Sequence, residues 1–245
     1  MAPLLVLSIV LQIGCIVHVI RTRRQTFWIF LLIAGSYIAI AAYLLAEVLP
    51  EMRHSRTANR VLREAHDRID PERRKRNATR QLDVADTIEN RRQLAEESLR
   101  SGDYQQAAEL YRSGLKGLYK TDPDLMLGLA RAQFALDQPA EAKQTLDELI
   151  AANPNFRSSE GHLLYARCVE ASGDTAAAAH EYEALIPGFS GEEARVRYGL
   201  MLKRDGQIAK ASEIFAESLK RARLAPNYYR REQREWIDIA KRESA

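Results

Sequence analysis

The feature of this sequence that most constrains its fold is a pattern that occurs four times between residues 86 and 226. Each copy has a small residue, a turn seven positions later, an alanine five positions after the turn, and a bulky residue four positions further on. In chain order, the small residues are Ala95, Ala130, Ala166 and Gly199, and the turn positions are Gly102, Asp137, Gly173 and Gly206. The alanines are Ala107, Ala142, Ala178 and Ala211, and the bulky residues are Tyr111, Leu146, Tyr182 and Phe215. Every series steps by 35, 36 and 33 residues, so the copies are repeats of one structural unit.

Each copy predicts two helices joined by the turn. In the first copy, Asp86 or Thr87 can cap the first helix, because a short polar side chain accepts hydrogen bonds from the first free N–H groups. Gly102 ends that helix, since glycine readily adopts the left-handed conformation found at helix stops. The small side chains of Ala95 and Ala107 allow the two helices to approach closely.

This pattern resembles the tetratricopeptide repeat. The residues that fit its signature are Ala95, Gly102, Tyr104, Ala107 and Tyr111 in the first copy, Gly173, Ala178 and Tyr182 in the third, and Gly199, Gly206, Ala211 and Phe215 in the fourth. The second copy departs from the signature, with Asp137 in place of glycine and Pro139 in place of the aromatic residue. In the third copy Pro187 and Gly188 end the second helix early, and we expect irregular geometry over residues 187–192.

The resemblance implies an all-α fold, an α-solenoid of four helix pairs. We expect the pairs at about residues 88–122, 123–158, 159–191 and 192–226. Residues 227–245 fit no further repeat and predict one capping helix, which Asn227 can begin. We expect Trp236 to pack against the last repeat rather than to bind a ligand.

Residues 1–50 predict a transmembrane helical hairpin. Two runs without charged side chains, residues 3–20 and 25–46, are long enough to cross a hydrocarbon core of about 30 Å. A cleaved signal peptide is disfavoured because the positive charge follows the first apolar run instead of preceding it. The residues expected at the membrane interface are Arg21, Arg23, Arg24, Trp28, Arg53, Arg56, Arg60 and Arg63.

The sequence contains arguments for two opposite orientations of this hairpin in the membrane. Arginines flank it on both sides, and the further basic residues up to Arg80 favour a cytoplasmic rather than a periplasmic repeat domain. The uncharged N-terminus followed by an arginine-rich loop favours the opposite orientation. We expect an integral membrane protein of a bacterial inner membrane, with the repeats in the cytoplasm.

The first 50 residues also resemble the two-helix N-terminal segment of phospholipase D-type cardiolipin synthases. The resemblance lies in an apolar run ending at residues 18–21, the basic residues after it, Trp28, and a second apolar run containing Gly35 and residues 43–45. The Pro-x-x-Gly kink usual in that second helix is missing. The catalytic HxKxxxxD motif of that family is absent, since none of the five histidines is followed by lysine two residues later. The resemblance therefore implies a shared membrane anchor without phospholipid chemistry.

Residues 51–86 predict a basic helical connector. Ten Lys or Arg and four acids lie between Arg53 and Arg80, and small apolar residues recur at helical spacing up to Ile69. Asp70 and Pro71 interrupt the helix. Two interpretations stay open. Residues 53–80 can lie on anionic lipid headgroups, or the connector can be a solvated spacer that packs on the first repeat.

No motif indicates an enzyme, a cofactor or a metal site. The sequence contains no phosphate-binding loop, no H-E-x-x-H and no G-x-S-x-G, and no two histidines stand at metal-ligating spacing on one helix. The net charge of +3 does not indicate nucleic-acid binding. Cys15 and Cys168 are too far apart for a metal or redox motif and are expected to be inert buried thiols.

The first helices of the repeats predict a groove that binds a protein or peptide partner. The candidate residues are Arg92, Leu127, Arg131, Phe134, Leu163, Arg167, Arg197 and Lys203. Arg131 and Arg167 occupy equivalent places in neighbouring repeats and are expected to stack along the groove. Because arginine binds carboxylates with two parallel hydrogen bonds, we expect an acidic segment as ligand. The alternative is that these arginines only pair with acids on their own helices.

Together these patterns favour a membrane-anchored adaptor that holds a protein partner at the bilayer. Two other interpretations stay open. One is a self-associating scaffold that forms a homo-oligomer through residues 187–189 or the C-terminal helix. The other is a non-catalytic accessory of envelope or phospholipid machinery.

Overall fold

The computed structural model describes residues 12–13, 16–17, 19–21, 70 and 72–244. The chain divides into two compact units, residues 1–73 and 74–245. In the first unit, residues 12–13, 16–17 and 19–21 are helical. Most of the predicted hairpin lies outside the described residues, and so does most of the segment that resembles cardiolipin synthases. Every predicted interface residue except Arg21 and most of the connector before residue 72 also lie outside them. Within the described part of the chain, no helix is both long and apolar enough to cross a membrane.

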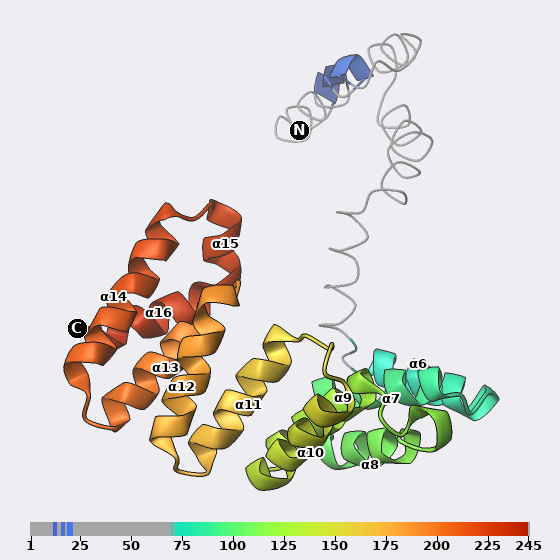
Figure 1. Ribbon diagram of the computed structural model, residues 1–245. Helices are drawn as coiled ribbons and strands as arrows, with labels where there is room; N and C mark the ends of the chain where they lie inside the picture. The colour runs from blue at the N-terminus through green and yellow to red at the C-terminus, as the bar shows by residue number, and fades with distance from the viewer. Residues whose placement is uncertain (1–11, 14–15, 18, 22–69, 71, 245) are drawn as a thin grey trace. The chain divides into compact units, whose positions relative to one another are not determined.

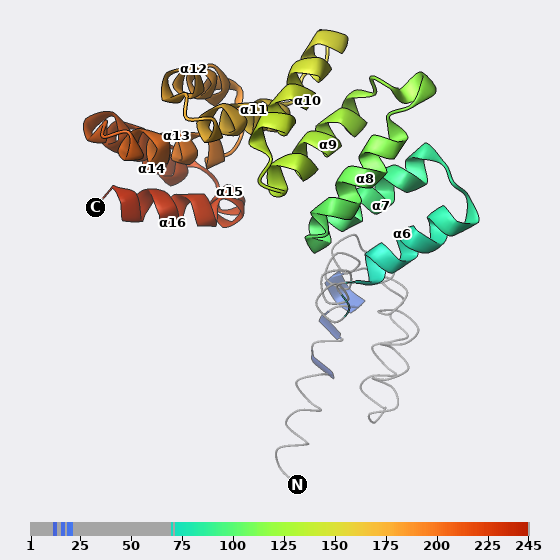
Figure 2. The same ribbon diagram turned by 90° about the horizontal axis from the view of Figure 1, so that it is seen from below.

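The second unit consists of helices that follow one another as antiparallel pairs (Figure 1). After α6 (Arg73–Val84), the pairs are α7 (Ile88–Ser101) with α8 (Tyr104–Gly114), α9 (Pro123–Ala135) with α10 (Pro139–Ala152), α11 (Ser159–Ala171) with α12 (Thr175–Leu185), and α13 (Glu193–Arg204) with α14 (Ile208–Leu224). Two single 3-10 turns, η2 (Gly117–Tyr119) and η3 (Ile186–Gly188), lie between pairs, and α15 (Asn227–Glu232) and α16 (Arg234–Glu243) follow the last pair. Figure 2 shows the pairs stacked in sequence order.

The turn within each pair has the conformation that the repeat register predicts. Gly102, Gly173 and Gly206 have φ angles of 82°, 86° and 81°. Asp137 takes the same place in the second pair with φ 60°, the one non-glycine residue of positive φ among the described residues. Aspartate tolerates the left-handed region because its short polar side chain can hydrogen-bond locally. The second repeat therefore keeps the geometry of the others without the glycine.

The connector ends in a helix that packs on the first repeat. Ala78 of α6 is buried, and Lys75 donates a 2.7 Å hydrogen bond to Asp103, whose side chain also caps α8. Thr87, not Asp86, caps α7, while Asp86 pairs with Arg91. For residues 73–84, these contacts agree with the interpretation of the connector as a spacer packed on the repeats.

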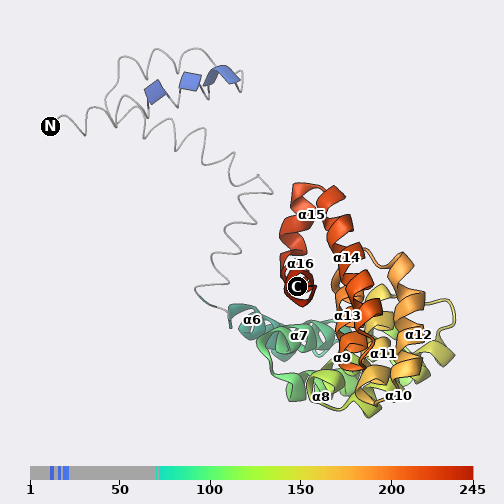
Figure 3. The same ribbon diagram turned by 90° about the vertical axis from the view of Figure 1, so that its left-hand side faces the viewer.

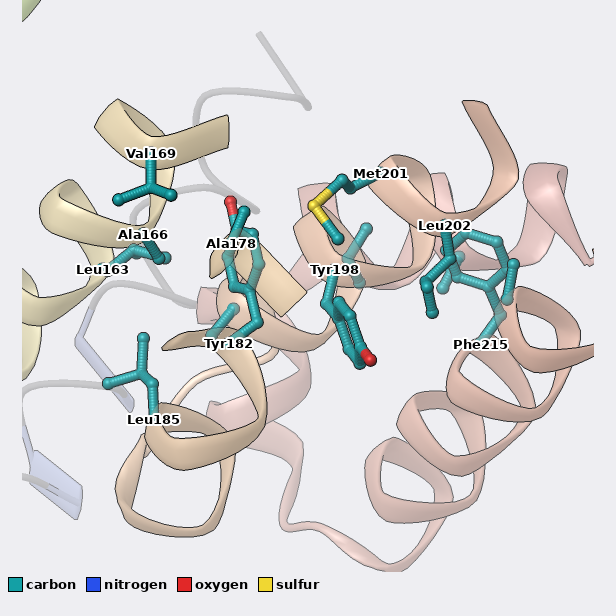
Figure 4. Packing of buried hydrophobic residues seen from close by; sticks show 14 residues of the cluster. Leu163, Ala166, Val169, Ala178, Tyr182, Leu185, Tyr198, Met201, Leu202 and Phe215 are labelled. Carbon is teal, nitrogen blue, oxygen red and sulfur yellow. The ribbon is translucent and has the colours of Figure 1, made fainter. Parts of the chain in front are cut away.

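Aromatic rings make close contacts with glycines and with one another, both within pairs and between neighbouring pairs. A Cβ atom added to Gly199 of α13 would lie 2.6 Å from the ring of Phe215 in α14. A Cβ atom added to Gly128 of α9 would lie 2.4 Å from the ring of Tyr111 in the preceding pair. In the largest core cluster, the rings of Tyr182 and Tyr198 stack with centroids 5.7 Å apart (Figure 4).

The third repeat is irregular after α12, at Pro187, as the sequence predicts. α12 ends at Leu185, η3 follows, and α13 begins only at Glu193. The fully buried Glu192 closes this segment: its Oε1 accepts hydrogen bonds from the Tyr229 hydroxyl at 2.6 Å and from Arg221 Nε at 3.3 Å. Its backbone N–H donates to Gln233 Oε1 at 2.9 Å. The buried carboxylate thus connects the break in the third repeat to the C-terminal helices.

The prediction of one capping helix is wrong, because the segment divides at Gln233 into α15 and α16 (Figure 3). At this break Tyr229 and Gln233 reach Glu192, while Ile237 and Ala240 of α16 are buried. Pro226 rather than Asn227 takes the capping position, without a side-chain hydrogen bond. Trp236 packs on the core beside α13 and α14, as predicted.

We predict that Glu192→Ala lowers the free energy of unfolding by about 3 kcal/mol, because it leaves buried Arg195 without its nearest buried countercharge and Tyr229 without an acceptor. Glu217→Ala is the control: it removes an exposed partner of the same arginine and should cost less than about 0.5 kcal/mol. Urea denaturation followed by circular dichroism measures both. Equal midpoints for Glu192→Ala and the wild type would refute the role of this carboxylate.

We also predict that Cys168 resists alkylation in the folded protein. Its side chain is buried, and burial raises the pKa of its thiol to about 11, so little thiolate exists at pH 8. In a Cys15→Ser background, iodoacetamide should modify Cys168 at least about tenfold more slowly in buffer than in denaturant. Mass spectrometry measures the two rates, and similar rates would contradict the prediction.

Candidate protein-interaction face

The first helices of neighbouring pairs, α7 with α9 and α9 with α11, contact one another directly. We call the surface formed by α7, α9, α11 and α13 the A-helix face. Because the second helices pack against the first helices of the next pair, side chains that point away from them lie on the A-helix face. The predicted partner-binding residues belong to these four helices.

Arg131 links two neighbouring first helices. Its guanidinium on α9 donates a 2.8 Å hydrogen bond to Glu160 in the first turn of α11. Both side chains are more than half exposed, with 51% and 70% of their surface open to solvent. An ion pair this exposed contributes about 0–1 kcal/mol, so another carboxylate can readily replace Glu160.

Arg167 has a different environment, although it occupies the equivalent position in the next repeat. Its guanidinium lies over the ring of Phe134 on α9, 4.4 Å from the ring centroid. No acidic side chain of the described residues forms an ion pair with it. Burial lowers the pKa of the Arg167 guanidinium, the nearby charge of Arg197 lowers it further, and the carboxylate of Glu193 acts in the opposite direction. The group remains cationic at neutral pH, since an arginine pKa lies far above that range.

The other predicted cations are already paired. Arg92 contacts Glu89 at 2.9 Å on its own helix, and Arg197 contacts Glu193 at 2.8 Å in the same way. Lys203 contacts Glu243 of α16 at 3.1 Å. The alternative of same-helix pairing therefore describes Arg92 and Arg197, but neither Arg131 nor Arg167.

Two of the apolar residues predicted to contact a partner, Leu127 and Leu163, lie in different environments. Leu127 of α9 is partly buried and lines a pocket described below. Leu163 is only 6% exposed, because it packs in the core cluster with Ala166 and Tyr182 (Figure 4). The prediction that Leu163 offers contact area to a partner is wrong.

A pocket of about 410 Å³ between the second and third repeats was not predicted from the sequence. Its lining residues are Leu127, Leu146, Leu149, Ile150, Phe156, Arg157, Ser158, Gly161, His162, Tyr165 and Glu181. One signal was present: in the repeat register Gly161 aligns with Leu125 of the second repeat, 36 residues earlier, so a large side chain is missing there. In the described part of the chain, no cluster of three His, Cys, Asp or Glu side chains could hold a metal ion.

Residues 98–168 match the family described as tetratricopeptide repeat. No curated protein matches the chain. Among solved structures, the thermophilic tetratricopeptide-repeat protein TTC0263 of Thermus thermophilus gives a TM-score of 0.55 at 19% identity, over 75% of this chain and 93% of that one. The MamA RS-1 ArsTM double mutant gives 0.53 at 17% identity, over 66% and 90%.

These matches agree with the repeat register and with the antiparallel pairs. The second unit is an all-helical solenoid of the tetratricopeptide type, as the residue pattern predicted.

Proposed function

We propose that this protein is a membrane-tethered adaptor whose A-helix face binds an acidic segment of a protein partner. The observation that supports the binding site is Arg167, a cation held on Phe134 without a carboxylate partner among the described residues. The other predicted cations of the face already have acidic partners. The helical repeat scaffold supports the general role, and Arg167 supports the chemistry of the ligand.

The environment of Arg167 favours capture of a carboxylate. The guanidinium is partly removed from water and lies over the Phe134 ring, which restricts its movement. Less rotational freedom is therefore lost when two parallel hydrogen bonds form to a carboxylate. Hydrogen bonds to a charged group contribute about 1.5–3 kcal/mol each, so one captured carboxylate adds substantially to affinity.

The proposed tether is the pair of charge-free runs at residues 3–20 and 25–46. A partner bound to a chain that is anchored in the bilayer has a raised effective concentration near other membrane proteins. No catalytic step is required for this function. We place the repeats on the cytoplasmic side, because basic residues continue from Arg53 to Arg80.

We predict that the double variant Arg131→Glu, Arg167→Glu loses its acidic partner, because two attractions become repulsions. Affinity purification of the full chain in detergent should recover at least about tenfold less of any stoichiometric partner, as each reversed contact removes a charge-assisted hydrogen bond. The matched control is Arg112→Glu, Arg223→Glu, which makes the same charge change at two exposed arginines on second helices. Equal recovery with both double variants would refute the site.

We predict that a fluorescent protein fused after Ala245 is fluorescent and that alkaline phosphatase fused there is inactive, because the basic flank keeps the repeats in the cytoplasm. The control places the same reporters after Arg24, between the two predicted spans, where the phosphatase should be active. A phosphatase active after Ala245 would reverse the orientation. Recovery of the full chain in the soluble fraction would refute the anchor.

A further inference from the structure

A basic segment without acidic residues lies where α14 ends and α15 begins, beside α16 (Figure 3). Residues 218–231 contain no Asp or Glu, and their five cations are Lys220, Arg221, Arg223, Arg230 and Arg231. Arg221 contacts the buried Glu192 at 3.3 Å. Within the described part of the chain, no acidic side chain forms an ion pair with the other four. We call residues 218–231 the basic corner.

A cavity of about 370 Å³ adjoins the basic corner. It is lined by residues of three helices, α14, α15 and α16: Leu219, Ala222, Arg223, Arg230, Ile237 and Lys241. Lys241 contacts Asp238 at 3.1 Å on its own helix. Arg230 donates a hydrogen bond to the neutral amide oxygen of Asn227. The cavity therefore combines an apolar wall with two arginines, Arg223 and Arg230, whose charge no described carboxylate neutralises.

Two large apolar side chains of the basic corner are exposed to solvent. Leu224, which follows Arg223 at the end of α14, is 82% exposed, and Tyr228 of α15 is 66% exposed. A tyrosine has an apolar ring and a polar hydroxyl, so it suits the boundary between lipid headgroups and hydrocarbon. Arginine and lysine can lay their aliphatic stems along an apolar surface and keep the charged group in the headgroup layer.

We propose that the basic corner binds the phosphate groups of anionic phospholipids at the bilayer surface, with a headgroup in the cavity between Arg223 and Arg230. Guanidinium groups bind phosphate oxygens with two parallel hydrogen bonds. Each Lys or Arg near an anionic leaflet contributes about fivefold in affinity. A soluble phosphate or an RNA would leave Leu224 in water, whereas a bilayer also covers Leu224 and Tyr228.

This inference goes beyond the proposed function, because none of these residues belongs to the A-helix face. The chain is long enough for both attachments. Residues 47–72 separate the second charge-free run from α6 and span at most about 90 Å when fully extended. For comparison, α14 is only about 25 Å long. In a tethered chain the docking is intramolecular, so weak affinity for lipid is sufficient.

The test places a dye whose emission rises in an apolar environment, nitrobenzoxadiazole, on Leu224→Cys in a Cys15→Ser background. Cys168 is buried and stays unlabelled in the folded chain. The full chain is reconstituted into liposomes of phosphatidylcholine, with or without phosphatidylglycerol. Emission should rise only with phosphatidylglycerol, and high salt should reverse the rise by screening the charges. The matched control is the dye on Ile208→Cys, at the other end of α14 and 53% exposed, which should not respond.

Charge reversal tests the two arginines of the cavity. Arg223→Glu, Arg230→Glu should lower the docking equilibrium at least about tenfold, because two attractions become repulsions. Arg223→Gln, Arg230→Gln should lower it by a smaller factor. The matched control is Arg112→Glu, Lys116→Glu, which changes two exposed cations near the end of α8 and should dock like the wild type. Circular dichroism checks that each variant is folded.

Three outcomes would overturn the inference. The first is no rise at Leu224→Cys with phosphatidylglycerol, or an equal rise at Ile208→Cys. The second is an equal rise in neutral liposomes, which would refute the role of the cations. The third is reversal by inorganic phosphate or single-stranded RNA at constant ionic strength, which would make a soluble anion the occupant.

The same measurements separate the basic corner from the proposed function. Arg131→Glu, Arg167→Glu should dock like the wild type, and Arg223→Glu, Arg230→Glu should still recover the protein partner in detergent. If the predicted anchor fails, the labelled chain is mixed with preformed liposomes, so the result does not depend on the tether.

Discussion

Close contact between an aromatic ring and a residue without a side chain is the constraint on which the repeat stack depends. Gly199 accepts the ring of Phe215 within one pair, and Gly128 accepts the ring of Tyr111 from the preceding pair. Neither glycine can gain a Cβ atom without displacing a ring. Interiors are packed as densely as organic crystals, so these contacts fix the spacing of the helices and the direction in which their outer side chains point.

In the part of the chain that the structure describes, each helix pair packs mainly on its sequence neighbours. What varies from repeat to repeat is the set of outward side chains on the first helices. In the proposed function, binding depends on charge and shape along the A-helix face. Arg167 is the predicted cation of that face that forms no ion pair with an acid among the described residues.

The register of small and bulky residues was sufficient to predict the four pairs, the turns and the irregular third repeat. It also identified Arg131 and Arg167 as equivalent positions, but not their partners. Phe134 and Glu160 lie at different distances along the chain from these arginines, and only the packing of α9 on α11 shows which of them each arginine meets. The break at Gln233 escaped prediction because it coincides with contacts to Glu192, 41 residues away in sequence.

The departures from a regular repeat are concentrated where the candidate site lies. The second repeat has Asp137 and Pro139 at its turn, and the third has Gly161 where the second has Leu125. Core packing favours filled positions, because an empty volume loses contacts on every side. A site that binds a partner needs such an opening, and local rules are most often broken at functional sites. Gly161 lines the pocket between these two repeats and directly follows Glu160, the partner of Arg131, so the irregular positions and the paired arginine belong to the same two repeats.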